Sequence, residues 1–528
     1  MESRRFVHAT VVLLVVIAVL CGVIFLAYFV IWPTPSSRVA NGGKPNIIIL
    51  LADDTGYGDF QTYGHPTQEW TAVDRMAKEG IKFTHWSSPA SVCSPSRAAL
   101  LTGRYPIRSG IFGKNTVFLD GSIGGLPHRE ITIAEALRDV GYATGMVGKW
   151  HLGINKKNST DGKNLPMHHG FEYVGINLPY TQLWFCDPKK YNITQMRSCF
   201  VYRNDKIIEQ PIKFETLTAR LVDDTKEFID NNKQNPFFFL LSFPQTHAAL
   251  FSDPRFTHTS KRGRYGDSVN EMGWAIGQVL DQLKYLGIDE DTLVLFLSDQ
   301  GPMVDGCGEA GDAGVFRGGK ATMWEGGVRV PAVAWWPGTI SPGTVSHATI
   351  STMDILPTAL KLAGAEDYLE ERKIAIDGKV INDVVKTDTA ESCHEALFYY
   401  CSDILMSARY KKYKIHYYTV DPMVSGIVSE GGDRCEYSNR TKLFNIFSCE
   451  HRAKKQDPPL IFNYEADPQE QISLDATTKE NQILLDIIAD LVQTHKASII
   501  PVQSEIDKPY YRSITPCCNP PACTCNYK

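Results

Sequence analysis

The sequence predicts an α/β fold, in which a mostly parallel sheet is flanked by helices and a smaller α+β domain follows. Two observations predict the sheet. Continuous apolar runs such as NIIILLA and TLVLFLS are typical of strands that are buried on both faces. Segments with helical periodicity separate these runs, which favours parallel strands joined by helices. A third observation, a change of pattern after about residue 385, predicts the second domain.

The first element is an apolar segment. Arg4 and Arg5 precede residues 11–32, which contain no charge and are long enough to span a bilayer. We expect a cytosolic end (1–10), a transmembrane signal-anchor or else a signal peptide (11–32), and a linker (33–44). The remaining chain would then enter the lumen of the secretory pathway, attached to the membrane by this segment.

The cysteines and the charge agree with that compartment. The chain has 13 cysteines, including Cys186, Cys199 and a tail group of Cys517, Cys518, Cys523 and Cys525. Such density favours disulfides in an oxidising lumen, with a zinc knuckle as the alternative for the tail. Three sequons offer glycosylation sites at Asn158, Asn192 and Asn439. A net charge of −5 without a Lys/Arg cluster argues against a nucleic-acid partner.

The body divides into a catalytic domain (45–385) and a C-terminal α+β domain with a Cys-rich tail (386–528). In the first, we expect strands over 46–52, 142–148, 236–243 and 292–298, and helices over 71–80, 131–141, 217–232 and 268–287. In the second, 395–401 and 412–420 indicate antiparallel strands. Residues 481–496 indicate a helix whose apolar side chains, among them Ile483, Ile487 and Ile488, we expect in the core.

Polar side chains follow four of the predicted strands. Asp53 and Asp54 end the first, and Asp299 and Gln300 end the run TLVLFLS. Ligand sites form beyond the carboxyl ends of strands in such sheets, and a cation offsets the cost of burying neighbouring carboxylates. These oxygen donors favour a hard ion such as Ca²⁺ or Mg²⁺. The alternative for the Asp pair alone is a turn with a helix cap.

Three further residues follow strands, and a fourth lies in a Gly-rich loop. Lys149 and His151 follow YATGMVG, and His247 follows PFFFLLSF. They could donate protons or hold an anion; structural histidines are the alternative. Lys320 lies in RGGKATMWEGG, where the backbone can approach an anion, although a simple loop lysine fits as well.

The stretch SVCSPSRAALLTGR indicates the start of a helix, with Ser94 as its cap and Pro95 in its first turn. Arg97 lies one turn beyond Cys93, near a helix N-terminus that attracts anions. At that place the pKa of a cysteine thiol would be lowered. The residues alone therefore predict an anion-binding, metal-assisted site with an unusual cysteine.

CSPSRAALLTGR resembles the signature of the type I sulfatases, and LADD, GKWHLG, SDQG and GGKATMWEGGVRVP match the family in the same order. The resemblance runs from about Pro45 to the C-terminus and is closest to the steryl-sulfatase branch of the arylsulfatases. GRYGDSVNEM is also similar to N-acetylgalactosamine-6-sulfatase. The resemblance implies an alkaline-phosphatase-like fold and a sulfuric ester hydrolase that acts on an aryl, steroid or sugar sulfate. A phosphate ester hydrolase of that fold is the alternative.

The resemblance also implies roles for the site residues. Cys93 would be oxidised to formylglycine by the formylglycine-generating enzyme, and one hydroxyl of the aldehyde hydrate would attack sulfur and displace the alcohol. The second hydroxyl would then help to expel sulfate, which regenerates the aldehyde. One Ca²⁺ per subunit would be bound by Asp53, Asp54, Asp299 and Gln300 together with the modified Cys93. Arg97, Lys149 and Lys320 would hold sulfate oxygens, His151 would orient or deprotonate the hydrate, His247 would assist the leaving group, and Thr181 would supply a substrate-binding hydroxyl.

One segment departs from the steryl-sulfatase pattern. Those relatives carry a long apolar membrane hairpin between the positions of Cys186 and Cys199, whereas this chain has the short polar segment CDPKKYNITQMRSC. Membrane attachment would therefore come from residues 11–32. We expect the protein in the lysosome or the endoplasmic reticulum, or secreted if the N-terminal segment is cleaved.

Overall fold

The computed structural model describes residues 43–180, 186, 198–304, 310–389, 391–420, 452–520 and 522–525. The predicted membrane segment (11–32), Thr181, Asn192 and Asn439 lie outside these residues. Residues 44–528 form one compact unit. Within the described part of the chain, no helix combines the length and the apolar character that crossing a bilayer requires.

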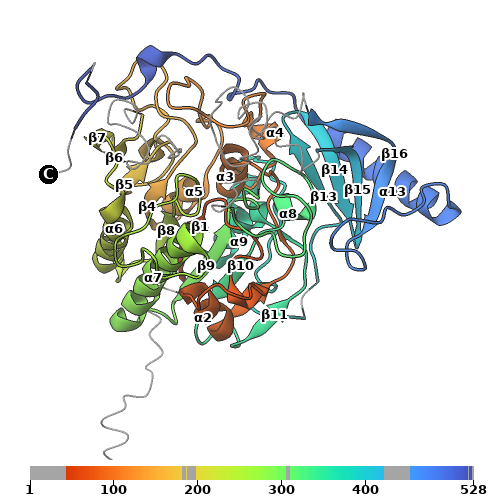
Figure 1. The fold of residues 1–528 in the computed structure, drawn as a ribbon, viewed down its shortest axis with the longest axis horizontal. Coiled ribbons are helices and arrows are strands. Elements are labelled where there is room, and N and C mark those ends of the chain that lie inside the picture. The colour runs from red at the N-terminus through yellow and green to blue at the C-terminus, as the bar shows by residue number, and fades with distance from the viewer. Residues whose placement is uncertain are drawn as a thin grey trace, which may run out of the picture. The chain divides into compact units, whose positions relative to one another are not determined.

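A ten-stranded mixed sheet forms the centre of this unit (Figure 1). The strand order is β11–β2–β10–β9–β1–β8–β4–β5–β6–β7. Strands β9, β1, β8, β4 and β5 are mutually parallel, while β10, β6 and β7 pair antiparallel with their neighbours. The bounds are β1 (Asn46–Ala52), β2 (Ile81–Phe83), β4 (Ala143–Lys149), β5 (Tyr173–Leu178), β6 (Val201–Arg203), β7 (Lys206–Glu209), β8 (Phe237–Ser242), β9 (Thr292–Ser298), β10 (Ala332–Trp335) and β11 (Thr344–Ser346). A separate pair joins β3 (Trp86–Ser87) and β12 (Ile350–Ser351).

Helices cover both faces of the sheet, as the apolar runs predict. In β1, Ile47, Ile49 and Leu51 face one core cluster, and Ile48 and Leu50 face the other, because successive side chains of a strand point to opposite faces. The first cluster includes side chains of α3 (Cys93–Thr102), α5 (Ile133–Asp139) and α9 (Ile355–Leu362), and the second those of α2 (Ala72–Glu79), α6 (Leu217–Asn232) and α7 (Gly263–Leu286). Short helices α4 (Pro106–Ser109), α8 (Glu325–Val328) and α10 (Tyr368–Glu371) lie in the connections.

The predicted elements of this domain are present. The bounds of β1, β9 and α6 coincide with the predicted ones, and α7 begins earlier, at Gly263 rather than Ser268. The expectation of a mostly parallel sheet holds for the five central strands. Strand β10 and the β6–β7 hairpin add antiparallel pairs that the sequence did not indicate.

The C-terminal part forms a four-stranded antiparallel sheet with one long helix (Figure 1). Its elements are β13 (Ala396–Cys401), β14 (Ile404–Tyr410), β15 (Tyr413–Thr419), β16 (Lys454–Asn463) and α13 (Lys479–Ala497). Leu484 and Ile488 pack in a cluster with Phe398 and Ile415. The expectation of a fully buried apolar set on α13 was wrong, because Ile483 and Ile487 are 52% and 40% exposed. Only one stripe of the helix faces the sheet.

Disulfides and the tail complete the unit. Cys186–Cys199, Cys517–Cys523 and Cys518–Cys525 are disulfide-bonded, which removes the zinc alternative for the tail. The tail returns to the sheet edge, where the amide of Gln210 donates to the carbonyl of Cys525 at 2.6 Å and the reverse bond is 2.8 Å. Gln210 directly follows β7, so the last part of the chain is paired with its first half.

Candidate active site

The carboxyl ends of the parallel strands bring the predicted residues together. Asp53 and Asp54 follow β1, Lys149 ends β4, His247 follows β8, and Asp299 and Gln300 follow β9. Helix α3 adds Cys93 and Arg97, and the loop before α8 adds Lys320. All of these side chains are buried. Of the predicted site residues, only Thr181 is outside the described part of the chain.

Cys93 lies between two of the predicted metal ligands. Its Sγ is 3.7 Å from Oδ1 of Asp53, and Nε2 of Gln300 donates to it at 3.5 Å. The side chain is 1% exposed. The expectation of an acidic thiol was wrong, since burial raises the pKa of Cys93 to about 11 despite the nearby Lys149. As an unmodified thiol, this residue would be a poor nucleophile.

Ser94 does not cap helix α3, which is a second correction. The helix begins at Cys93, and Val92 occupies the N-cap position without a side-chain hydrogen bond. Instead, Oγ of Ser94 donates to the carbonyl of His151 at 2.8 Å and accepts from the amide of Phe118 at 3.2 Å. Ser94 therefore joins the helix to the loop that carries His151.

Two cations hold Asp53 and Asp299 in place. Nζ of Lys149 contacts Oδ2 of Asp53 at 2.5 Å. Arg97 donates from Nε to Oδ2 of Asp299 at 3.0 Å, and its Nη1 donates to the carbonyl of Lys149 at 3.0 Å. Against the effect of burial, the charges of Lys149 and Arg97, and that of His247 when its ring is protonated, hold the pKa of Asp53 below its usual value. For Asp299, burial and the charge of Asp53 raise the pKa.

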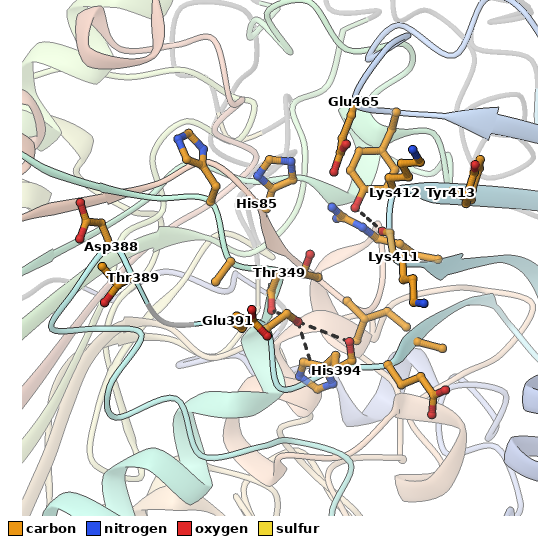
Figure 2. Close-up of a pocket in the computed structure, with 18 residues that line it drawn as sticks. His85, Thr349, Asp388, Thr389, Glu391, His394, Lys411, Lys412, Tyr413 and Glu465 are labelled. Carbon is orange, nitrogen blue, oxygen red and sulfur yellow. Dashed lines mark hydrogen bonds between the residues drawn. The ribbon is translucent and has the colours of Figure 1, made fainter.

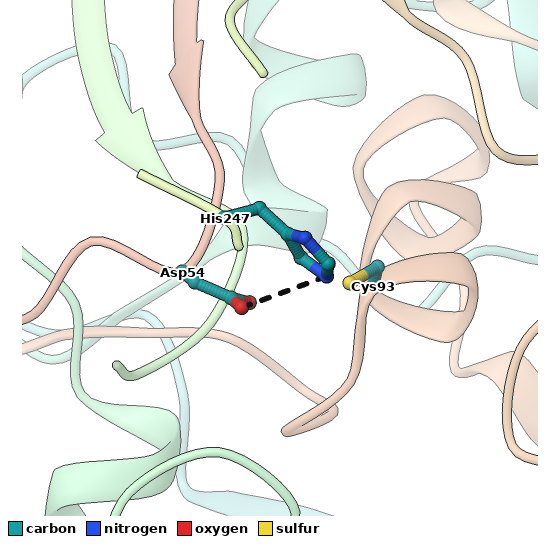
Figure 3. Close-up of side chains that lie close together, drawn as sticks. All are labelled: Asp54, Cys93 and His247. Carbon is teal, nitrogen blue, oxygen red and sulfur yellow. Dashed lines mark ion pairs between the residues drawn. The ribbon is translucent and has the colours of Figure 1, made fainter. Parts of the chain in front are cut away.

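Asp54 lies between Lys320, Gln300 and His247. Nζ of Lys320 donates to Oδ2 at 2.7 Å, Nε2 of Gln300 donates to Oδ1, and Nε2 of His247 lies 3.8 Å from Oδ2. Figure 3 shows the side chains of Asp54, Cys93 and His247 converging from three segments. The backbone of Asp54 has a φ of 57°, in the left-handed region.

In each of the two histidines, one ring nitrogen contacts a main-chain carbonyl. Nε2 of His151 is 2.9 Å from the carbonyl of Phe118, and Nδ1 is buried and has no hydrogen-bond partner among the residues that the structure describes. Burial, with Lys149 and Arg97, holds the pKa of His151 well below its usual value. Nδ1 of His247 contacts the carbonyl of Ala248, and burial together with Lys320 lowers its pKa to about 4. Both rings are therefore neutral near pH 7.

Two groups of ligand atoms are close enough to share an ion. One atom each of Asp54, Cys93 and His247 lies within 4.8 Å of the others, and so do atoms of Asp53, Cys93 and Asp299. Their formal charges are balanced, because three carboxylates (Asp53, Asp54, Asp299) face three cations (Arg97, Lys149, Lys320).

Sequence reasoning missed several supporting residues. Ser242, the last residue of β8, accepts from Nη1 of Arg97 at 2.7 Å, and its place at a strand end was the available signal. Tyr265 on α7 donates to Asp59 at 2.5 Å and contacts Thr246 at 2.8 Å, joining the loops that carry Asp54 and His247. No pattern in the sequence indicated the Tyr265 contacts.

The fold and this arrangement define a hydrolase that handles an anionic group. Residues 45–365 match the sulfatase family, and residues 392–525 match the family described as the C-terminal region of aryl-sulfatase. The chain belongs to the sulfatase family and is an enzyme that hydrolyses sulfate esters.

Similar proteins agree with this assignment. The chain is 44% identical to an arylsulfatase of Hemicentrotus pulcherrimus over 92% of this chain and 87% of that protein. It is 35% identical to the human steryl-sulfatase (85% and 86%) and 35% identical to a rat N-acetylgalactosamine-6-sulfatase (88% and 87%). Among solved structures, the PsFucS1 sulfatase from Pseudoalteromonas sp. is similar with a TM-score of 0.71 and 26% identity, covering 88% of this chain and 93% of that one.

Proposed function

We propose that this sulfatase works with Cys93 converted to formylglycine and with one Ca²⁺ held by Asp53, Asp54, Asp299, Gln300 and the modified residue. The burial of Cys93 among these ligands carries the proposal. A thiol with a pKa of about 11 is a weak nucleophile, whereas an oxygen nucleophile formed from the same residue would lie where Sγ now contacts Asp53 and Gln300.

The donor set fits a hard divalent cation. Three carboxylates and one amide supply oxygen ligands, which Ca²⁺ prefers. Oε1 of Gln300 is buried without a hydrogen-bond partner in the described part of the chain, while Nε2 points at Asp54 and Cys93. Exchanging the two amide atoms directs Oε1 toward those residues and provides the fourth oxygen. Since the six protein charges cancel, a divalent cation would make the site positive and attractive to a sulfate ester.

When bound, Ca²⁺ would draw electron density from the sulfate oxygens, and the hydrate of residue 93 would supply the displacing hydroxyl. Lys149, Lys320 and Arg97 would bind and orient the sulfate group; Lys149 and Lys320 now contact carboxylates with which a metal ion would compete. Their burial strengthens each charge interaction, because water screens them poorly.

His151 and His247 would each transfer a proton through one particular ring nitrogen. The hydrogen of His151 lies on Nε2, which contacts the Phe118 carbonyl, so the free Nδ1 is the base for a hydrate hydroxyl. The hydrogen of His247 lies on Nδ1, so Nε2 is the atom that would first take up a proton and then pass it to the oxygen of the leaving alcohol. Ser94 would support this arrangement by fixing the main chain of His151.

The substrate class and the compartment belong to the same proposal. Relatives named as arylsulfatase, steryl-sulfatase and N-acetylgalactosamine-6-sulfatase match most of this chain at 44%, 35% and 35% identity, so aryl, steroid and sugar sulfates are all candidate substrates. Disulfides and the exposed Asn158 sequon support a lumenal, glycosylated protein in the lysosome or endoplasmic reticulum. Thr181 would add a substrate contact, and residues 11–32 would provide the membrane anchor or a cleaved signal.

Mass spectrometry of the peptide that contains Cys93 tests the central point. We expect a hydrazide-reactive aldehyde in protein from a lumenal expression host, and no aldehyde in a Cys93→Ala variant. Active protein that carries only the unmodified thiol would refute the proposal. The result does not depend on which sulfate ester is the natural substrate.

A second assay separates sulfate from phosphate ester hydrolysis. Matched aryl sulfate and aryl phosphate substrates release the same phenol, so their rates compare directly. We expect the aryl sulfate to be hydrolysed faster than the aryl phosphate. Both activities are also measured in the Lys320→Met variant, which serves as the control. A panel of steroid and glycosaminoglycan sulfates then identifies the substrate class.

A further inference from the structure

A cavity of about 1010 Å³ lies beside the turn between β14 and β15 (Figure 2). Its walls come from the turn between β14 and β15 with Lys411 and Lys412, from residues 388–389 and 391–396, and from the loops that carry His85 and His347. None of the candidate active-site residues lines this cavity. It therefore belongs to a different part of the molecule.

Arg409 lines this cavity and is unusual for a buried cation. Its side chain is 2% exposed, and among the described residues Nε, Nη1 and Nη2 make no hydrogen bond of normal geometry, although the nearby Tyr464 side chain helps to raise the pKa of Arg409. The guanidinium carbon lies 3.9 Å from the centre of the Tyr464 ring, which covers one face of the group. The donors point outward in the guanidinium plane, so the ring leaves them unsatisfied. Burying unsatisfied charged donors is costly, which predicts a missing partner.

The buried carboxylates Glu325 and Glu470 already have other partners. Glu325 has the largest charge effect on Arg409, but its Oε2 accepts from Arg329 at 2.6 Å and its Oε1 accepts from Lys414 at 2.8 Å. Both oxygens of Glu470 are also used: Oε2 accepts from the amide of Glu325 at 2.6 Å, and Oε1 contacts His416 at 2.7 Å.

The charges of this buried group do not balance. Three buried cations, Arg329, Arg409 and Lys414, face two buried carboxylates, Glu325 and Glu470. Burial lowers the pKa of His416, so its ring is neutral near pH 7 and does not change the sum of charges. Counted over the described residues of this group, one positive charge remains, and Arg409 is the member without a hydrogen-bonded anion.

The rim of the cavity does not supply that anion. The acidic residues that line it, namely Asp388, Glu391, Glu395 and Glu465, are exposed and make no ion pair with Arg409. Lys411 and Lys412 stand on the same rim and are also exposed. Figure 2 shows both lysines beside Tyr413 on the turn between β14 and β15. A small anion that enters the cavity would meet these lysines before Arg409.

We propose that this cavity is an anion-binding site, in which Arg409 holds a compact oxyanion such as a sulfate group through its planar donors. The bond would satisfy Arg409 and cancel the excess charge of the buried group. Two sources share this chemistry: free sulfate, which the enzyme releases, and a sulfate substituent on a sulfated saccharide. The site is independent of the formylglycine and Ca²⁺ assignments.

Calorimetric titration with sodium sulfate at constant ionic strength tests the site. We expect the full-length protein to bind two sulfate ions, one at the candidate active site and one at Arg409. The Arg409→Met variant should lose one ion or bind it at least about tenfold more weakly, and Lys320→Met should affect the other. A titration of Arg409→Met that matches the wild type overturns the proposal, whatever Lys320→Met shows.

Two further measurements complete the test. The first does not require the Arg409→Met variant to fold, and the second identifies the source of the anion. Wild-type crystals soaked in selenate should show an anomalous peak beside the Arg409 guanidinium, and a peak only at the active site overturns the proposal. Titration of mono- and disulfated disaccharides distinguishes the sources. If the site binds a sulfate group of a saccharide, the Arg409→Met variant should bind disulfated disaccharides about tenfold more weakly than the wild type. If the site binds free sulfate, the variant should differ from the wild type only in the titration with sodium sulfate.

Discussion

The hydroxyl of Ser94 connects three segments of the active site at the position next to Cys93. It donates to the carbonyl of His151 and accepts from the amide of Phe118, whose carbonyl in turn contacts Nε2 of His151. The ring and the main chain of His151 are thus both fixed by this small group. Ser94 is therefore a positioning residue for the proposed base.

The Ser94→Ala variant should lower kcat about tenfold and cost about 1–2 kcal/mol in stability. The amide of Phe118 loses its acceptor, and the His151 loop loses a contact to helix α3. Rates of aryl sulfate hydrolysis, normalised to the aldehyde content of residue 93, measure the first effect, and thermal unfolding measures the second. Ser94→Thr keeps the hydroxyl and serves as the control. An unchanged normalised kcat in Ser94→Ala would contradict this role.

The residues of the site could be identified from the sequence, because the chemistry requires particular residue types. Their hydrogen-bond partners could not be identified in this way. The carboxylates at strand ends and Cys93 stand out in the sequence by type and place. The pKa of Cys93, however, depends on how completely the fold buries it, and desolvation outweighs the opposing charges of Lys149 and Lys320. Likewise, Ser94 matches the pattern of a cap, but the position of His151 gives its hydroxyl other partners.

Elements were predicted best where both faces are buried. Strands β1 and β9 have continuous apolar runs with clear ends, so their bounds and the polar residues after them follow from the sequence. Short strands such as β10 and β6 offer only three or four residues, too few to show a period or a direction. On α13, the apolar spacing did not reveal that the sheet covers only one stripe.

Helix α7 carries a buried acid outside the active site. Glu271 is 1% exposed, and its Oε2 accepts from the amide of Asp253 at 3.1 Å. Burial raises the pKa of Glu271 to about 7. The folded state therefore keeps the proton up to about pH 7, whereas the unfolded chain releases it near the ordinary value of 4.5. The contribution of Glu271 to the free energy of unfolding is therefore fully present below pH 4.5 and decreases as the pH rises toward 7.

The Glu271→Gln variant should remove this pH dependence. Relative to wild type, its free energy of unfolding should gain about 3 kcal/mol between pH 4.5 and pH 7.5, because 1.4 kcal/mol corresponds to each pKa unit. The amide can still accept from Asp253 and does not ionise. Urea unfolding of both proteins across this range gives the difference, in which other titrating groups cancel. Parallel stability curves would show that Glu271 is not the group responsible.

At the scale of the whole molecule, the proposed Ca²⁺ site draws its ligands from three distant parts of the chain. Asp53 and Asp54, Cys93, and Asp299 and Gln300 come together only in the folded state. An ion bound there stabilises the folded state alone. Since three cations already neutralise the carboxylates, the metal-free protein should remain folded.

Removal of the ion with EDTA should lower Tm, and added Ca²⁺ should restore it. Saturation at about 100 times Kd corresponds to about 2.7 kcal/mol. Calorimetric scans of treated and reloaded protein measure the change, with Asp299→Asn as a variant whose Tm should respond less. Equal Tm values with EDTA and with Ca²⁺, together with no detectable Ca²⁺ binding, would remove the metal from the proposal.

The pairing of Cys525 with Gln210 has a consequence for the order of events during synthesis. The edge of the large sheet is complete only when the last residues of the chain have left the ribosome. Until then, the earlier segments can assemble but lack their final neighbour. A delay of this kind would keep Cys93, which the finished fold conceals, open to the proposed modification in the nascent chain.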